Sequence, residues 1–292
     1  MDPSSWPVDA GVPAQPERRD VLCFTACWGA ACLAGPVTLA QAQAQAPLAV
    51  REYGRTLLVD KSGRPFKGRQ LTAGEPHIFN YPYETTPVFL MALPNPATPV
   101  QLSSEKQQRY ESLRGSGAQY NIVAYSAICA HKLMYPTPEI SFINIRKGQA
   151  NEPAHVVHCC GDNSRYDPTQ GGKVISGPAP QPLAMIVLQW NPASDELHAV
   201  GTLGAEMFQA FFEKYEARLS LERGATAKNP SAKTAVVQTA SNYSRQLQAC
   251  KAGFTRNKPC PRSAPTTTST CTSRKRGAAR RSSSSTNSGT SS

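Results

Sequence analysis

A cysteine and a histidine near the middle of the chain have a spacing that suits metal binding. Cys129-Ala130-His131 follows an apolar run and stands ahead of a turn that contains Pro136 and Pro138. A Cys-x-His pair whose side chains lie on one side of a loop can present a thiolate and an imidazole to two neighbouring metal ions. By itself the pair is a weak signal, because the pattern occurs by chance in many chains.

A second loop adds two more cysteines, Cys159 and Cys160, in the run His158-Cys159-Cys160-Gly161-Asp162-Asn163-Ser164. The chain has nine cysteines, but only Cys129 and this pair lie within its patterned middle part. Three cysteines do not complete a simple disulfide framework, so they indicate a metal or redox site.

Short apolar runs broken by turns must position the two loops. Residues 122–125 lead into Cys129, and residues 155–158 lead into Cys159. Apolar runs with turn residues at their ends predict β-strands. Further strands are expected at 55–59, 87–93, 183–190 and 196–200, the last two as a hairpin around Asn191-Pro192-Ala193-Ser194-Asp195.

One helix is expected late in the chain, from Ala205 to about Glu222. Apolar side chains recur there at spacings of three and four and form one face, which consists of Met207, Phe208, Phe211, Phe212, Tyr215 and Leu219. The sequence therefore predicts a mainly β domain of antiparallel strands with one C-terminal α-helix. No Gly-x-Gly-x-x-Gly, P-loop or Gly-x-Ser-x-Gly pattern occurs, which argues against nucleotide binding and hydrolase chemistry.

Between residues 120 and 190 the chain resembles the Rieske iron–sulfur family. The resemblance is carried by Tyr125 to His131, by Ser164, by Tyr166-Asp167 and by Gly177-Pro178-Ala179-Pro180. The family has a Cys-x-His box, then a Cys-x-x-His box followed by Ser, an aromatic residue and Asp, then a Gly- and Pro-rich loop that covers the cluster. The resemblance implies an antiparallel β-sandwich with inserted cluster-binding loops. It also implies a [2Fe-2S] cluster, with two thiolates on one iron and two imidazoles on the other.

Cys129 and His131 match the first box, and the second box can be aligned in two registers. Cys160, the preferred ligand, heads the register that ends at Asn163, whereas Cys159 heads the ungapped register that ends at Asp162. Neither register places a histidine at the fourth position. Many Rieske proteins also have a cysteine pair that cross-links the two loops, but Met134 stands near the position of its first member, so that disulfide is not expected.

Three arrangements could complete the ligand set. Cys159 and Cys160 could both bind, His158 could turn into the site, or Asp162 could supply an oxygen. Two other functions stay open beside the electron-transfer protein or oxidoreductase subunit that the resemblance implies. One is a cluster-free accessory or structural subunit with the Rieske fold, and the other is a thiol–disulfide protein that uses a bond between Cys159 and Cys160.

Residues 1–46 form an N-terminal extension with the features of an export signal. Arg18-Arg19 precedes the charge-free run from Val21 to Ala40, and small residues follow as far as Ala46. This order resembles the twin-arginine class of signals. We expect cleavage near Ala46, with a retained membrane anchor as the alternative, and a location in the periplasm or on the periplasmic face of the inner membrane.

The net charge of +11 is concentrated at the C-terminal end. Residues 251–292 contain nine Lys or Arg residues and no acidic residue, which leaves +2 for residues 1–250. We therefore divide the mature chain into a β domain at 47–225 and a linker with a disordered basic Ser/Thr/Arg tail at 226–292. A nucleic-acid partner is not expected. The resemblance implies a redox partner such as a cytochrome or a membrane-bound or periplasmic oxidoreductase subunit, with membrane contact through the N-terminal segment if that segment is retained.

Overall fold

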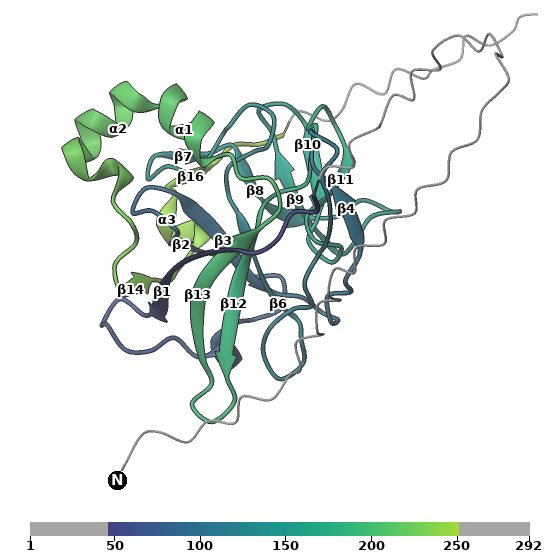
Figure 1. Cartoon of the computed structure of the whole chain (residues 1–292), viewed down its shortest axis with the longest axis horizontal. Coiled ribbons are helices and arrows are strands. Elements are labelled where there is room, and N and C mark those ends of the chain that lie inside the picture. The colour runs from purple at the N-terminus through teal and green to yellow at the C-terminus, as the bar shows by residue number, and fades with distance from the viewer. Residues whose placement is uncertain (1–45, 251–292) are drawn as a thin grey trace, which may run out of the picture. The chain divides into compact units, whose positions relative to one another are not determined.

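Strands dominate residues 46–250, the part of the chain that this computed structural model describes (Figure 1). The largest sheet has eight strands in the order β14–β1–β13–β12–β6–β3–β2–β15. Every recorded pair in it is antiparallel except β1 with β14. In chain order its strands are β1 (Arg51–Val59), β2 (His77–Asn80), β3 (Pro87–Ala92), β6 (Ile122–Ser126), β12 (Met185–Asn191), β13 (Glu196–Leu203), β14 (Thr234–Val236) and β15 (Gln238–Thr239).

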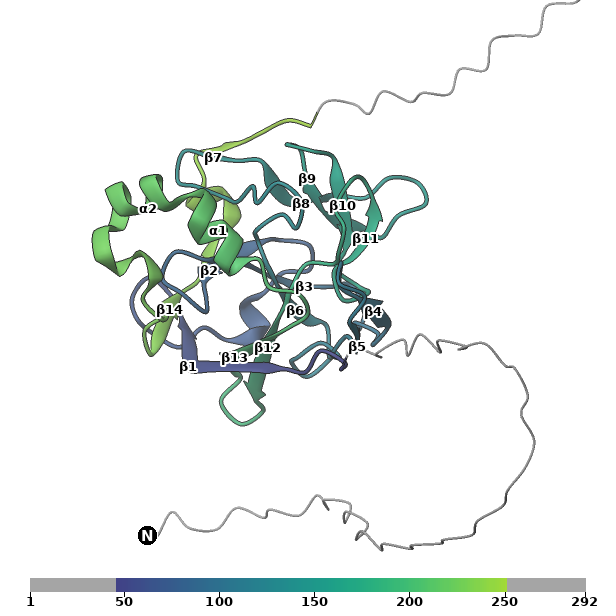
Figure 2. The same ribbon diagram turned by 45° about the horizontal axis from the view of Figure 1, so that its top comes forward.

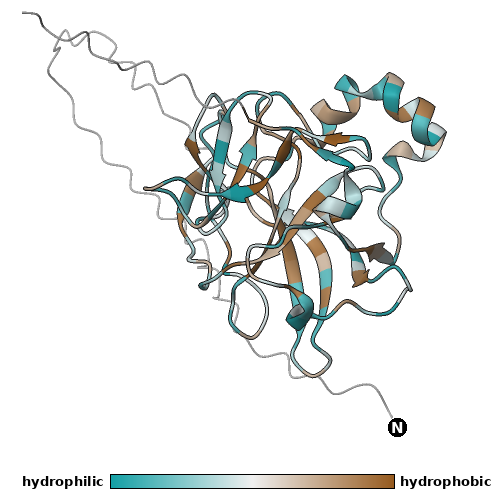
Figure 3. Ribbon diagram, turned by 180° about the vertical axis from the view of Figure 1, so that it is seen from behind, coloured by the Kyte–Doolittle hydropathy of each residue, from teal (hydrophilic) through white to brown (hydrophobic). Residues whose placement is uncertain are grey.

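Both faces of this large sheet are covered, which explains the uninterrupted apolar runs of its central strands. In β3, Val88 and Leu90 pack into one buried cluster, while Phe89 and Met91 pack into another on the opposite face. Side chains alternate between the two faces of a strand, so a strand buried on both sides must be apolar throughout. Figure 3 shows hydrophobic residues along the strands in the interior of the fold.

A second sheet carries the cysteine pair. Its four antiparallel strands lie in the order β11–β10–β9–β8, and their bounds are β8 (Ile143–Lys147), β9 (His155–Cys159), β10 (Ser164–Asp167) and β11 (Lys173–Ser176). Ile143, Val157 and Tyr166 of this sheet share a buried cluster with Phe89 and Tyr125 of the large sheet. The two sheets therefore pack face to face, and Figure 2 shows the smaller one beside the larger.

Two pairs of short strands complete the β structure. One pair is antiparallel, β4 (Gln101–Ser103) with β5 (Arg109–Glu111), and the other is parallel, β7 (Ile140–Ser141) with β16 (Gln246–Leu247). The predicted mainly β class is confirmed, and the predicted hairpin at 183–190 and 196–200 is formed by β12 and β13.

The predicted late helix lies in the expected region but is not continuous. It is divided into α1 (Phe208–Lys214) and α2 (Glu216–Arg223), because Tyr215 has φ −108° and ψ 16°, outside the helical range. The Tyr215 ring packs edge-on against Tyr135, with 4.8 Å between ring centroids, which ties the break to the core. The other helices are α3 (Ala240–Tyr243) and the 3₁₀ turns η1 (Gly68–Gln70) and η2 (Gly224–Lys228). Among the described residues no helix has the length and apolar character needed to cross a bilayer.

Residues 226–250, predicted as part of a linker, belong to the fold. The strands β14 and β15 extend the large sheet at its two edges, and Ala235 and Val237 are buried in its core. The linker prediction missed them because strands of two or three residues are too short to show a period. The predicted signal up to residue 45 and the predicted disordered tail at 251–292 lie outside the described residues.

The turn between β12 and β13 provides a test of this part of the fold. Asp195 accepts hydrogen bonds from the Trp190 indole at 2.7 Å and from the Arg69 N–H at 3.0 Å. We expect Asp195→Ala to lower the free energy of unfolding by about 1–2 kcal/mol in a denaturant titration. Asp195→Asn should cost less, since asparagine keeps an acceptor oxygen and tolerates the φ of 57° found here.

The Asp195 carboxyl also determines how the stability of the fold changes with pH. Burial opposes ionisation of Asp195, but the bonds from Arg69 and Trp190 outweigh it, and the pKa is lowered below its ordinary value. Its contribution to stability is therefore present at neutral pH and is lost as the pH falls through the folded-state pKa, below about 4. The Asp195→Ala variant should lose less stability than wild type over that acid range; an equal loss would contradict this account.

Candidate functional site

The first loop of the site follows β6 and is closed on itself by main-chain hydrogen bonds. Leu133 N donates to Cys129 O at 3.0 Å, and Cys129 N donates to Met134 O at 2.9 Å. Leu133 and Tyr135 then turn away from the site and pack among the buried aromatic side chains of α1. The helix that the apolar period predicted therefore fixes the loop that carries Cys129 and His131.

The second loop is the turn of the β9–β10 hairpin. Cys159 and Ser164 are paired across the two strands, so the loop consists of the four residues between them. Asn163 N donates to Cys159 O at 2.7 Å, and Asn163 has φ 63°, a left-handed conformation that asparagine adopts more readily than most residues. The hairpin thus presents Asp162 at its tip.

The two loops bring three donor side chains together. The ligand atoms of Cys129, Cys159 and Asp162 lie within 4.8 Å of one another. Cys129 Sγ donates to Asp162 Oδ2 at 3.3 Å, and the same oxygen accepts from His131 Nδ1 at 3.0 Å. The Asp162 side chain is 1% exposed and that of His131 is 37% exposed, so His131 forms the accessible edge of a buried cluster.

Tyr166 and Ser164, on β10, line the same cluster. The Tyr166 hydroxyl lies 3.3 Å from Cys129 Sγ and accepts the Ala130 N–H at 3.2 Å. Ser164 N donates to Asp162 Oδ1 at 2.8 Å. The Ser164 hydroxyl is buried and has no hydrogen-bond partner among residues 46–250. An unpartnered buried hydroxyl is costly, which points to an acceptor that the protein itself does not supply.

The protonation states of the cluster follow from these contacts. Hydrogen bonds from Cys159, then from Tyr166 and the N–H groups of the loop, lower the pKa of Cys129 to about 7 against the effect of burial. The bond to Cys129 and burial raise the pKa of Cys159, which stays a thiol. Burial opposes ionisation of Asp162, but hydrogen bonds from Ser164 N and the two thiols hold its pKa below the ordinary value. The cluster thus contains one readily formed thiolate and one carboxylate.

The loops also touch outside the donor set. A Cβ atom added to Gly161 would lie 3.0–3.1 Å from carbon atoms of Met134, so the first and second loops meet there without a disulfide. A Cβ atom added to Gly177 would lie 2.5 Å from Ser164 Cα, and this close approach requires glycine. The Gly- and Pro-rich segment at 177–180 therefore packs against the second loop, as the resemblance implied.

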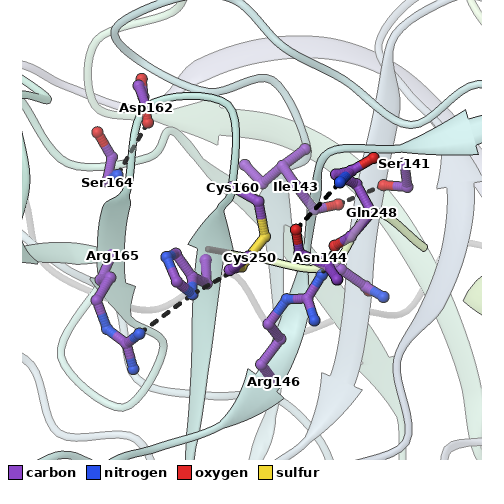
Figure 4. The surroundings of a disulfide bond; sticks show 12 residues. Ser141, Ile143, Asn144, Arg146, Cys160, Asp162, Ser164, Arg165, Gln248 and Cys250 are labelled. Atoms are coloured by element: carbon purple, nitrogen blue, oxygen red, sulfur yellow. Dashed lines mark hydrogen bonds between the residues drawn. A yellow bond between two sulfur atoms is a disulfide. The ribbon is translucent and has the colours of Figure 1, made fainter. Parts of the chain in front are cut away.

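Cys160 lies apart from the donor cluster, because it forms a disulfide with Cys250 (Figure 4). The Cys159–Cys160 bond that the alternative thiol–disulfide function requires is therefore not formed, and Cys159 is a free buried thiol. Adjacent residues point to opposite sides of a strand, so the β9 end that directs Cys159 inward directs Cys160 away. The preference for Cys160 over Cys159 is not supported, since a disulfide sulfur has no thiolate to donate.

Of the weaker candidates, Asp162 belongs to the donor cluster, whereas His158 and Asn163 lie apart from it. His158 lies beside the disulfide, with Nδ1 3.2 Å from Cys250 Sγ, and Asn163 forms the turn rather than the donor set. Cys250 lies outside the patterned middle part of the sequence. Nothing in the sequence identified its partner, because disulfide connectivity does not follow from cysteine positions alone.

No protein-family model matches this chain. Among solved structures, the chain is similar to the soluble domain of the Rieske protein II (soxF) from Sulfolobus acidocaldarius. The two are 24% identical over 53% of this chain and 82% of that chain, with a TM-score of 0.38.

Tyr166→Phe tests the geometry of the donor cluster. The variant loses the hydroxyl beside Cys129 and leaves the Ala130 N–H without its acceptor, so we expect unfolding free energy to fall by about 1–3 kcal/mol. In metal-free protein the Cys129 thiolate should appear at higher pH, as followed by its ultraviolet absorbance. The control is Tyr135→Phe, which removes a buried hydroxyl that has no partner among the described residues. Equal effects from both variants would contradict the assigned contact.

Proposed function

We propose that this chain is a one-electron carrier of Rieske type. Cys129 and Cys159 would bind one iron of a [2Fe-2S] cluster as thiolates, and His131 and Asp162 would bind the other. The observation that supports this most directly is the meeting of a Cys-x-His loop and a Cys-x-x-Asp loop in one buried cluster. The cluster, when bound, takes up and releases single electrons.

The chemistry of the donors fits such a group. Two sulfur ligands, an imidazole and a carboxylate surround the site, and all but the imidazole are buried. The two cysteines would bind iron as thiolates, having lost their protons. The hydroxyl of Tyr166 beside Cys129 and the buried, unpartnered hydroxyl of Ser164 would be available as hydrogen-bond donors to sulfur.

The carboxylate of Asp162 distinguishes this site from one with two imidazoles. It adds a negative charge, and negative charge on the ligand set favours the oxidised state. Replacing two thiolates by two neutral imidazoles raises the potential from about −400 mV to between about −150 and +300 mV. We therefore propose that the reduction potential of this cluster is lower than that of [2Fe-2S] clusters with two histidine ligands. The Ser164 N–H bond to Asp162 offsets part of this shift by withdrawing charge from the carboxylate.

His131 is the route by which electrons would leave or enter. Its side chain is the exposed member of the donor set, while Cys129 and Cys159 are fully buried. A redox partner such as a cytochrome or another oxidoreductase subunit would dock over this edge. On the export features of residues 1–46 we propose that this partner lies in the periplasm or at the periplasmic face of the inner membrane.

A second candidate is a site for a single metal ion. The separations of 3.0 and 3.3 Å from Asp162 Oδ2 to its two neighbours are close to those between ligands of one tetrahedral ion. Metal–ligand bonds of about 2.0–2.3 Å place tetrahedral ligands about 3.3–3.8 Å apart. Such a site would hold one iron or zinc and no inorganic sulfide.

The iron and sulfide content of the protein distinguishes a [2Fe-2S] cluster from a single metal ion. The chain expressed with iron and purified without oxygen should contain about two irons and two acid-labile sulfides, with an EPR signal after reduction. Cys129→Ser should lose most of both. One metal ion without sulfide would favour the second candidate. Folded protein that binds no metal on reconstitution would contradict both and leave the cluster-free accessory subunit.

Substitution of Asp162 tests the fourth ligand. Asp162→His should retain iron and raise the reduction potential, since a neutral imidazole replaces a charged carboxylate. Asp162→Ala should lose iron at least about tenfold more readily than wild type in a chelator challenge. The matched control is Asp167→Asn, because Asp167 is also buried but bonds to Thr169 outside the donor set. An unchanged potential in Asp162→His would show that Asp162 is not a ligand.

A further inference from the structure

The Cys160–Cys250 disulfide joins the second loop of the site to a C-terminal strap, residues 244–250. The two cysteines are 90 positions apart in the sequence. The strap runs beside residues 137–141, which continue the first loop, and donates main-chain hydrogen bonds from Arg245 to Pro138, from Gln246 to Glu139 and from Gln248 to Ser141. A single segment therefore contacts the continuation of one site loop and is covalently bonded to the other.

Apart from the disulfide, the strap is held by hydrogen bonds rather than by buried apolar side chains. Ser244 is its only buried residue, and its Oγ donates to Thr137 O at 2.6 Å. Leu247, the strap's largest apolar side chain, is 43% exposed. A segment with few buried apolar contacts opens at low free-energy cost. Opening of the disulfide would therefore release the strap without unfolding the sheets.

The surroundings of the disulfide favour a cysteine thiolate as a leaving group. His158 Nδ1 lies 3.2 Å from Cys250 Sγ and 3.1 Å from Arg165 Nη1. Arg146 donates to the main-chain oxygen of Gln248 in the strap. Figure 4 draws the disulfide between the side chains of Arg165 and Arg146. Nearby cations stabilise a thiolate and thereby speed its departure from a disulfide.

The two arginines differ in their partners. Arg165 is paired with Glu152, whose Oε1 accepts from Arg165 Nε at 2.8 Å. Arg146 has no acidic partner among the described residues, and its Nε is buried without a hydrogen-bond partner there. Arg146 therefore adds a positive charge beside the strap that no acidic side chain among the described residues neutralises.

The thiols of the donor cluster do not open this disulfide from within. Cys129 and Cys159 are both buried without measurable exposure. Cys160 and Cys250 are partly exposed. Among residues 46–250 no other cysteine has an exposed thiol, so the attacking thiolate is sought in a partner protein.

We propose that the Cys160–Cys250 disulfide is a thiol–disulfide exchange site for a partner protein with a reactive dithiol. A partner thiolate attacks Cys160 Sγ, forms a mixed disulfide and releases the Cys250 thiolate, which takes up a proton. The second partner thiolate then attacks the partner's own sulfur in the mixed disulfide and releases Cys160. The partner dithiol is oxidised to a disulfide, and the chain's disulfide is reduced by two electrons to two thiols.

Reduction also has a consequence for the donor cluster, which rests on the function proposed above. The released strap no longer holds the β9–β10 turn, so Cys159 and Asp162 bind metal in a loosened loop. Metal should therefore leave the reduced protein faster than the oxidised protein.

The test uses the full oxidised chain, with dithiothreitol as the dithiol. Mass spectrometry after alkylation should show Cys160 and Cys250 modified under native conditions. Hydrogen exchange at the Gln246 and Gln248 amides should accelerate about tenfold or more, while amides in β3 stay protected. In the Cys250→Ser variant the same two amides should exchange at the fast rate before any reductant is added, and dithiothreitol should have no further effect. Arg146→Met should slow the reduction several-fold, whereas the exposed Arg109→Met should not.

These readouts do not depend on bound iron, so they separate this proposal from the function of the site. Unchanged amide exchange after complete reduction would overturn the strap release, even in protein that holds a full cluster. Cysteines that react only after unfolding in urea would overturn the exchange site. If reduction accelerates amide exchange in the strap of a protein that binds no iron, the exchange site is supported. Only the consequence for metal release is then rejected.

Discussion

The arrangement of the site depends on the hydrogen bonds that the buried Asp162 carboxylate accepts. It accepts from Cys129 and His131 in the first loop and from the main-chain N–H of Ser164 at the start of β10. Because a buried charge without partners is strongly unfavourable, the carboxylate forces the two loops into one relative position.

Other parts of the fold hold the two loops in this relative position. The first loop is held by Leu133 and Tyr135 against α1, and the second loop is the end of a hairpin in the smaller sheet. The segment at 177–180 packs on the second loop through Gly177. The disulfide to Cys250 adds a covalent tie from the C-terminal strap. Short loops on such rigid elements can keep donor atoms close to the geometry that a metal needs.

The sequence predicted the features that depend on local patterns. Apolar runs located β3, β6, β9 and β12, and the spacing of Cys129, His131 and Cys159 located both loops. The choice between Cys159 and Cys160 could not be made in the same way. It depends on which of two adjacent side chains faces the core, and this is set by the pairing of Cys159 with Ser164 across the hairpin.

Features that depend on contacts between residues far apart in the sequence could not be predicted, for a related reason. The disulfide joins residues 90 positions apart, and strands as short as β14 and β15 show no period of their own. The late helix breaks at Tyr215, whose ring packs against Tyr135 of the first loop, and a helical period does not reveal this long-range contact. In each case tertiary packing, rather than local sequence preference, determines the outcome.

The central claim is that one imidazole and one carboxylate complete the set of two thiolates. The most direct measurement is electron–nuclear double resonance on the reduced protein with nitrogen-15-labelled histidine. The account predicts coupling to a single histidine nitrogen, and this coupling should disappear in His131→Ala. Coupling to two histidine nitrogens, or to a histidine other than His131, would contradict it.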